Sequence, residues 1–256
     1  MANHFTWYQL MTTHPGEAAR FYASVVGWTA QEGQGPAQDY TVFEAAGEGV
    51  GGAMALPELA RQAGAPPHWT GYIGVDSVES MLECLQGAGG TVHHAAEDIP
   101  GIGRFAVVAD PQGAAFMLFR WENGVGPNTP AAGGGAGHCG WHELHTTDWQ
   151  AASGFYSSLF GWTKTDAMDM GPMGTYQMFE MGDGVTMGGM FNKRPDVPMP
   201  AWLFYFNVPE INAAMARVTE GGGQVLNGPV QVPGGTMIAQ CRDPQGAMFA
   251  LAAPPK

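Results

Sequence analysis

The chain has 256 residues, a length that suits one large domain or two of ordinary size. It carries 10 Lys and Arg against 23 Asp and Glu, a formal net charge of −13. A surface this acidic repels phosphate backbones and anionic headgroups, so we exclude nucleic acid and membrane surfaces as partners. The hydrophobic share of 45% predicts a packed core, and the 39 Gly and 19 Pro predict many short strands and tight turns.

The cysteines and the first residues bear on the compartment. Cys84, Cys139 and Cys241 are odd in number and far apart, so we expect neither a disulfide framework nor a thiolate zinc site. The chain starts without a basic region followed by an apolar stretch, and no run approaches the ~18 apolar residues of a membrane span. We therefore expect a cytoplasmic protein.

The predicted elements of the first half follow one another in a regular order. They are a strand at 5–13, a helix at 15–26, strands at 39–45, 49–55 and 68–75, a helix from Asp76 or Ser77 to the glycines at 87–90, and strands at 104–109 and 114–119. Pro15 suits a first helical turn and Gly27 a helix end. Asp-Pro-Gln-Gly at 110–113 predicts the turn of a hairpin.

The second half repeats the first at a shift of about 134 residues. Trp7 pairs with Trp141, Phe21-Tyr22 with Phe155-Tyr156, Gly27-Trp28 with Gly161-Trp162, and the Asp-Pro-Gln-Gly turn with 243–246. The helices of this half are predicted near 149–160 and 210–219. The order strand, helix, strands thus occurs four times, which predicts four βαβββ modules and an α+β fold with mostly antiparallel pairing.

A segment rich in Gly and Pro separates the two halves. Residues 122–137 contain almost no core-forming side chain and are predicted to be a flexible linker. We therefore predict two domains, at 1–121 and 138–256.

The motifs Phe-Tyr, Gly-Trp and Asp-Pro-x-Gly, in this order in each half, resemble those of the vicinal oxygen chelate superfamily. Its members include glyoxalase I, bleomycin-resistance proteins and extradiol dioxygenases, and the likeness is strongest to duplicated two-domain glyoxalase-like proteins of actinobacteria. The resemblance implies two glyoxalase-like domains, each with a curved sheet around a cavity. It also implies a divalent metal bound in that cavity by His, Gln and Glu side chains.

The positions at which the superfamily carries these ligands hold other residues in this chain. They are Trp7, Thr70 and Met117 in the first half and Trp141, Leu203 and Ala250 in the second. Indole and aliphatic groups do not coordinate such a metal, which needs imidazole nitrogen and carboxylate oxygen. We therefore expect no metal and no other cofactor. Trp7 and Trp141 are expected to fill space or to stack on a flat ligand.

The segment Trp141-His142-Glu143-Leu144-His145 is the most polar stretch on a strand that the resemblance places at the cavity. Side chains alternate along a strand, so Trp141, Glu143 and His145 share one face and His142 lies on the other. Glu143 and His145 are therefore candidates for an acid–base pair, although such neighbours also form purely structural hydrogen bonds. The opposite faces of His142 and His145 argue against a shared metal.

These observations favour a protein that binds or sequesters a small apolar or aromatic molecule without the superfamily metal. The expected ligand-binding residues are Trp7, Gln9, Met11, Thr70, Met117, Trp141 and Leu203. Two alternatives remain: a metal-independent lyase or isomerase that uses Glu143 and His145 as catalytic residues, and a metal-dependent glyoxalase or dioxygenase. A monomer and a homodimer are both compatible with four modules in one chain.

Overall fold

The structure is a computed structural model that describes residues 3–33, 40–62, 64–122, 124, 134–182 and 184–255. In the first half the elements are β1 (Phe5–Thr12), α1 (Pro15–Val26), β2 (Thr29–Glu32), β3 (Thr41–Ala45), β4 (Glu48–Ala55), α2 (Glu58–Gln62), β5 (His68–Gly74), α3 (Val78–Gly87), β6 (Thr91–Ile99), β7 (Gly103–Ala109) and β8 (Ala115–Trp121). In the second half they are β9 (Cys139–Thr146), α4 (Trp149–Phe160), β10 (Thr163–Asp169), a 3-10 helix (Gly171–Met173), β11 (Thr175–Glu180), β12 (Thr186–Asn192), β13 (Ala201–Asn207), α5 (Ile211–Glu220), β14 (Gln224–Gln231), β15 (Met237–Arg242) and β16 (Met248–Ala253).

The strands form two mixed sheets of eight strands with the same internal order. The first runs β2-β3-β4-β1-β5-β8-β7-β6 and the second β10-β11-β12-β9-β13-β16-β15-β14. In each module the first and last strands pair in parallel, as β9 does with β12, and the other pairs are antiparallel. The predicted α+β fold of four βαβββ modules is confirmed. Within the described part of the chain, no helix is long and apolar enough to cross a bilayer.

Strands β2 and β6 were absent from the sequence prediction. Both lie at the edges of their sheet, and all of β2 and most of β6 is exposed. An edge strand with two solvated faces carries no alternation of apolar and polar residues, so only its backbone pairing shows it to be a strand. The short helix α2, which buries no side chain, was missed for the same reason. The predicted linker lies largely outside the described residues.

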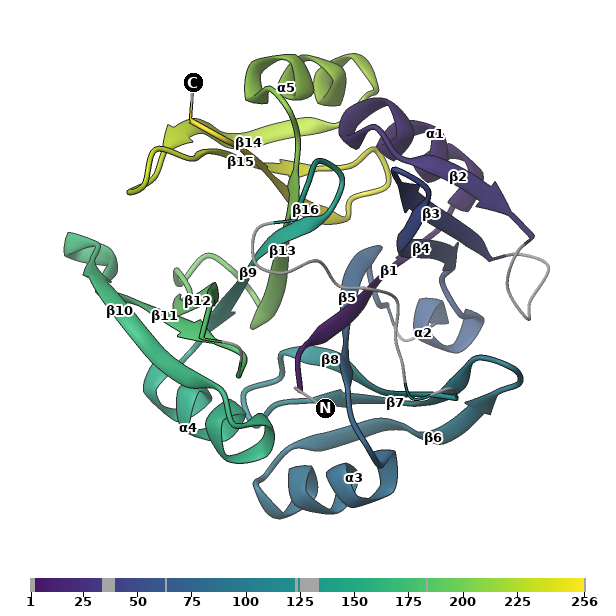
Figure 1. Cartoon of the computed structure of the whole chain (residues 1–256), viewed down its shortest axis with the longest axis vertical. Coiled ribbons are helices and arrows are strands. Elements are labelled where there is room, and N and C mark those ends of the chain that lie inside the picture. The colour runs from purple at the N-terminus through teal and green to yellow at the C-terminus, as the bar shows by residue number, and fades with distance from the viewer. Residues whose placement is uncertain are drawn as a thin grey trace. The chain divides into compact units, whose positions relative to one another are not determined.

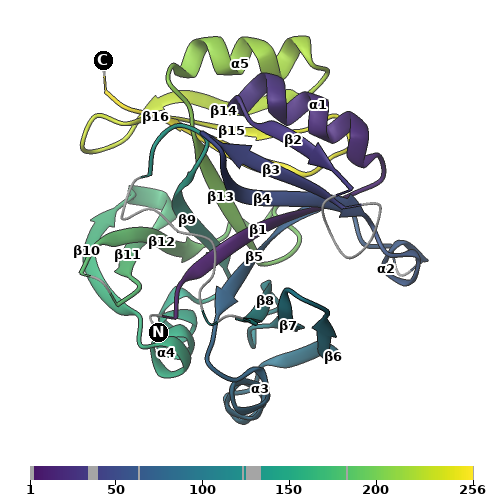
Figure 2. The same ribbon diagram turned by 45° about the vertical axis from the view of Figure 1, so that its right-hand side comes forward.

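The contacts among residues divide the chain into two compact units that do not follow its two halves. The first unit contains Met1–Trp7, Gly71–Asn128 and Trp141–Trp202, and the second contains Tyr8–Thr70, Thr129–Gly140 and Leu203–Lys256. Each unit therefore takes one module from each half. In the first unit α4 covers the strands β10 to β12 (Figure 1), and in the second α1 and α5 lie side by side (Figure 2).

Within the first unit a buried tyrosine joins the two modules. Tyr156 on α4 donates its hydroxyl hydrogen to Oδ2 of Asp110 at 3.2 Å and accepts from Nε1 of Trp202 at 3.2 Å. Asp110 stands in the Asp-Pro-Gln-Gly turn of the other module, where its Oδ1 accepts the backbone N–H groups of Gln112 and Ala114. Burial raises the pKa of the Asp110 carboxyl, and these hydrogen bonds oppose the rise.

The second unit contains the same arrangement in the symmetry-related residues. Tyr22 on α1 donates to Oδ2 of Asp243 at 3.1 Å and accepts from Nε1 of Trp69 at 2.9 Å. Burial again raises the pKa of the aspartate, whose Oδ1 accepts three backbone N–H groups of its own turn. The Asp-Pro-Gln-Gly turn, which was predicted to join two strands of a hairpin, therefore also contacts a module of the other half.

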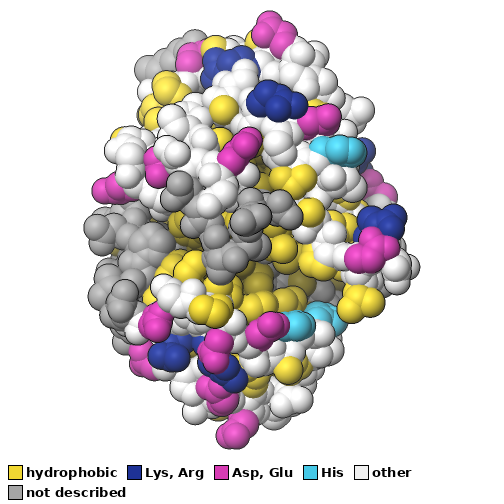
Figure 3. Space-filling view, turned by 90° about the vertical axis from the view of Figure 1, so that its right-hand side faces the viewer, with side chains coloured by type: hydrophobic (Ala, Val, Ile, Leu, Met, Phe, Trp, Pro, Cys, Tyr) yellow, Lys and Arg dark blue, Asp and Glu magenta, His cyan; other side chains and the backbone are white. Residues whose placement is uncertain are grey.

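The surface carries the acidic excess of the sequence. On the face drawn in Figure 3, the few Lys and Arg side chains lie among Asp and Glu side chains. The three cysteines, all within the described part of the chain, form no disulfide: Cys84 is exposed, Cys139 is half-buried and Cys241 is buried. Burial raises the pKa of the Cys241 thiol to about 12, so this thiol is protonated and unreactive at neutral pH.

The buried tyrosines are expected to contribute strongly to stability. Tyr156→Phe leaves the Asp110 carboxylate and the Trp202 N–H without their partner, so the free energy of unfolding should fall by about 2–4 kcal/mol. Tyr22→Phe should cost a similar amount, and Ser158→Ala, which removes an exposed hydroxyl from the same helix as Tyr156, less than about 0.5 kcal/mol. Urea denaturation measures all three. Equal effects of Tyr156→Phe and Ser158→Ala would contradict this role.

Candidate functional site

A chain of hydrogen bonds runs along one face of β9, within the first unit. Nε1 of Trp141 donates to the hydroxyl oxygen of Tyr176 at 2.7 Å, and this hydroxyl donates to Oε2 of Glu143 at 3.0 Å. Oε1 of Glu143 lies 2.8 Å from Nε2 of His145. The three β9 residues predicted to share a face are thus joined in one network. His142 lies on the opposite face, where it is buried.

Glycine on the neighbouring strand makes room for the tyrosine. Strand β12 pairs with β9 in parallel, with Gly189 opposite Glu143 and Phe191 opposite His145. A Cβ atom on Gly189 would overlap the ring of Tyr176. Because Gly189 has no side chain, Tyr176 crosses β12 from β11 and its hydroxyl reaches Glu143.

Aromatic rings surround the polar pair. The rings of His145 and Phe191 lie 4.7 Å apart, and those of Tyr176 and Phe191 stack at 5.7 Å. The side chain of His145 is 19% exposed and that of Glu143 is 9% exposed. The imidazole is thus the part of the pair that an incoming molecule can reach, while the carboxylate lies behind it.

The matching positions of β1 in the first half carry neither a carboxylate nor an imidazole. Gln9 and Met11 occupy the positions of Glu143 and His145, and Nε2 of Gln9 lies 3.2 Å from the sulfur of Met54. Tyr40 contacts Gly52 as Tyr176 contacts Gly189. The tyrosine and glycine are therefore common to both halves, and the acid–imidazole pair is particular to the second.

The other expected ligand-binding residues are buried. Trp7, at the start of β1, packs edge-on against Trp121 with ring centroids 6.2 Å apart. Met117 on β8 lies opposite Tyr72 in the same unit. Thr70 and Leu203 belong to the second unit, where both are buried.

A family model describes almost the whole chain. The model of the Glyoxalase/Bleomycin resistance protein/Dioxygenase superfamily matches residues 2–118 and again 135–251. The chain belongs to this superfamily.

Two relatives share the full duplicated length. CFP32 of Mycobacterium bovis, which bears a glyoxylase name, is 32% identical over 250 residues, covering 97% of this chain and 94% of its own. The anthracycline biosynthesis protein DauV of a Streptomyces species is 32% identical over 257 residues, covering 96% and 91%.

Solved structures show the same fold at low sequence identity. The Mn(II)-bound glyoxalase of Novosphingobium aromaticivorans has a TM-score of 0.69 and 15% identity, over 98% of this chain and 82% of that one. The 2,3-dioxygenase LapB of Pseudomonas sp. KL28 has a TM-score of 0.68 and 13% identity, over 100% and 94%. These two likenesses concern the fold alone.

The side chains at the superfamily's ligand positions do not fit a divalent metal. Those positions hold Trp7, Thr70, Met117, Trp141, Leu203 and Ala250, which together offer one hydroxyl and one thioether as donors. Within the described part of the chain, no three His, Cys, Asp or Glu side chains lie together as metal ligands. His142 is turned away from His145, and its Nδ1 lies 2.9 Å from the carbonyl oxygen of Met187.

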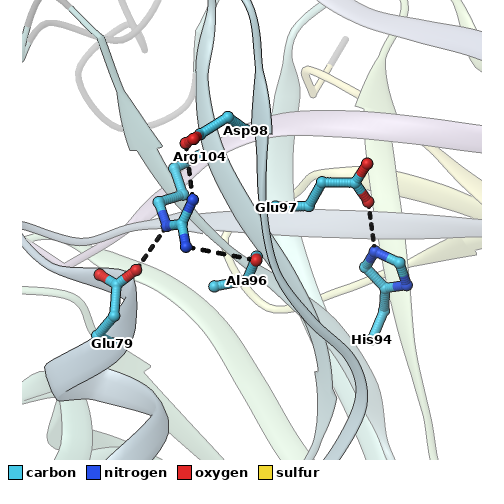
Figure 4. Close-up of polar contacts among 6 residues, drawn as sticks. All are labelled: Glu79, His94, Ala96, Glu97, Asp98 and Arg104. Carbon is cyan, nitrogen blue, oxygen red and sulfur yellow. Dashed lines mark hydrogen bonds and ion pairs between the residues drawn. The ribbon is translucent and has the colours of Figure 1, made fainter.

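Another polar cluster lies on the surface of the first unit. Figure 4 shows Arg104 between Glu79 and Asp98, at 2.5 and 2.8 Å. His94 and Glu97 form a separate pair at 2.7 Å. Glu79, Asp98, His94 and Glu97 are all at least half exposed, so solvent screens these contacts and each adds little to stability. The cluster lies at the β6 edge of the sheet and carries no sign of a ligand site.

Sequence reasoning missed Tyr176, which belongs to the network, and the residues Phe191, Gly188 and Gly189 around it. Tyr176 lies on another strand, and only the pairing of β11 with β12 brings it to Glu143. Phe191 was not singled out, because its position opposite His145 depends on the strand register. The pair Gly188-Gly189 was noted only for its lack of metal donors, although two adjacent glycines in a strand also signal a close approach by another group.

The buried imidazole of His142 should make the protein sensitive to acid. Burial lowers its pKa from 6.5 to about 4, with His4 acting in the same direction. The unfolded chain therefore binds this proton at a higher pH than the native protein does. The free energy of unfolding is therefore unaffected by this group above about pH 6.5, and it falls by about 3 kcal/mol as the pH drops to 4.

His142→Asn should lower stability at pH 7 but flatten its fall between pH 6.5 and 4. Urea denaturation at several pH values measures this slope. Asp110 and Asp243, whose raised pKa values act in the opposite direction, are present in both proteins and cancel in the comparison. His93→Asn, at an exposed histidine, is the control and should keep the wild-type slope. An unchanged slope in His142→Asn would contradict the assignment.

Proposed function

We propose that the chain binds a small apolar or aromatic organic molecule on the β9 face that carries Trp141, Glu143 and His145. The observation that carries this proposal is a hydrogen-bonded acid–imidazole pair, partly open to solvent, among three aromatic rings. The binding serves sequestration and uses no divalent metal at the superfamily positions. The partner is a small molecule, and the charge of −13 disfavours nucleic acid and membrane surfaces.

The composition of this face supports such a ligand. Sites for small molecules are mostly apolar and aromatic, with a few polar groups that fix the orientation of the ligand. Here the half-buried indole of Trp141 offers a flat surface on which an aromatic ligand can stack, and the buried ring of Phe191 packs against His145. The identity with DauV, a protein named for anthracycline biosynthesis, also supports an aromatic ligand.

The same pair of residues favours a second candidate, a metal-independent lyase or isomerase. In this mechanism His145 accepts a proton from the substrate and returns it at another atom, and the Glu143 carboxylate at 2.8 Å stabilises the imidazolium formed in between. The contact of Tyr176 with Glu143 would hold the carboxylate in place during both transfers.

A neutral flat probe tests the binding proposal. Equilibrium dialysis with 2-methylnaphthalene should show saturable binding, and Trp141→Ala should weaken it about 10-fold through the loss of ring contact, worth ~1.4 kcal/mol. The control is Trp149→Ala, because Trp149 lies on α4 beside Lys164 and outside the network.

The outcomes of this experiment separate the candidates. Equal weakening by both tryptophan variants, or no saturable binding, contradicts the proposed site. Conversion of an aromatic ligand to a new product, abolished by Glu143→Gln, supports the enzyme instead.

Metal analysis tests the other part of the proposal. Protein purified without chelator, incubated with Mn²⁺, Zn²⁺ or Ni²⁺ and then desalted is expected to hold well below one metal ion per chain. The physical reason is the donor set, in which indole and aliphatic groups stand where imidazole and carboxylate would be needed. Plasma mass spectrometry measures the content. A stoichiometric ion that Glu143→Gln and His145→Met remove would overturn the metal-free site and favour the metal-dependent enzyme.

A further inference from the structure

The hydrogen bonds of the network define where its hydrogens lie. An indole nitrogen only donates, so the oxygen of Tyr176 is the acceptor in its contact with Trp141. The hydroxyl keeps a hydrogen of its own and donates it to Oε2 of Glu143. One oxygen of the carboxylate is therefore occupied by the tyrosine.

The second carboxylate oxygen fixes the tautomer of the histidine. Oε1 of Glu143 lies 2.8 Å from Nε2 of His145, and an ionised carboxylate can only accept. Nε2 therefore carries the hydrogen, and in the neutral ring Nδ1 has the free electron pair. Nδ1 of His145 has no hydrogen-bond partner among the described residues, and this side chain is the more exposed member of the pair.

We propose that Nδ1 of His145 accepts a hydrogen bond from a hydroxyl group on an aromatic ligand. The site then selects phenolic molecules over molecules of the same shape without a donor. Phe191, which is buried opposite His145 with its ring 4.7 Å away, gives that acceptor an apolar surrounding. This inference rests on the proposed function and adds to it the chemical class of the ligand.

Glu143 and Tyr176 act as positioning residues in this proposal. Glu143 holds the hydrogen on Nε2, and Tyr176 holds the carboxylate. In the first half Gln9 and Met11 replace the pair, so that face offers no imidazole acceptor. The selection of phenols is therefore a property of the second half. Because Met11 occupies the position of His145 in the first half, methionine is a suitable replacement when His145 is mutated.

The test compares two probes of nearly equal shape, 2-naphthol and 2-methylnaphthalene. Equilibrium dialysis gives both dissociation constants for the wild type and for His145→Met. Their ratio should shift about 10-fold against 2-naphthol in His145→Met, while the affinity for 2-methylnaphthalene changes less than about 2-fold. Taking the ratio of the two dissociation constants within each protein cancels any general loosening of the site. Comparing this ratio between the wild type and the variant cancels the different hydration of the two probes.

The positioning role has a spectroscopic readout. In protein labelled with ¹⁵N at histidine, NMR distinguishes the two imidazole tautomers, and the wild type should show His145 protonated at Nε2. Its Nδ1 signal should move on addition of 2-naphthol and stay in place with 2-methylnaphthalene. Glu143→Gln can turn its amide N–H towards Nε2, so it should raise the share of the Nδ1-protonated tautomer and reduce the preference for 2-naphthol. Glu83→Gln, the same change at an exposed position of α3, is the control variant.

The outcomes separate this inference from the function on which it rests. Binding of both probes with a ratio that His145→Met leaves unchanged overturns the phenol selection and leaves the proposed function standing. A wild-type His145 protonated at Nδ1 also overturns it. Failure of both probes to bind removes the proposed function, and the inference with it.

Discussion

The structure depends on two buried tyrosine hydroxyls that each bridge two modules of the fold. Tyr156 meets Asp110 in one unit, and Tyr22 meets Asp243 in the other. A buried carboxylate is unfavourable unless its oxygens are satisfied, and here one oxygen takes backbone N–H groups while the other takes the tyrosine. The aspartate turn of one half is therefore complete only when the helix of the other half is packed against it.

Because of these contacts, the compact units of the structure do not coincide with the two halves of the sequence repeat. The repeat divides the chain into two successive halves, and each half supplies one eight-stranded sheet. The compact units instead combine the outer modules with each other and the inner modules with each other. Within each unit, aromatic side chains of a helix from one half pack against the last strand of a module from the other half, as Phe21 and Tyr22 do against Phe249. Burial and hydrogen bonding therefore connect the two halves.

The two halves share the framework of the candidate site but differ in its polar residues. Both halves keep the tyrosine and the glycine that lets it cross the strand, as Tyr176 and Gly189 show in the second. The first half has Gln9 where the second has Glu143, and an amide does not polarise an imidazole as a carboxylate does. The chemistry thus changed at two strand positions while the framework that orients them stayed the same.

Local periodicity and motifs a few residues long are enough to predict the four modules, the four longer helices and the shared face of Trp141, Glu143 and His145. Sequence reasoning missed the edge strands β2 and β6, whose exposed side chains have no apolar period. The contact of Tyr176 with Glu143 emerges only in the folded chain, because it depends on the strand register and on the absence of a Cβ atom at Gly189. Contacts between distant segments are set by packing, which no single stretch of sequence encodes.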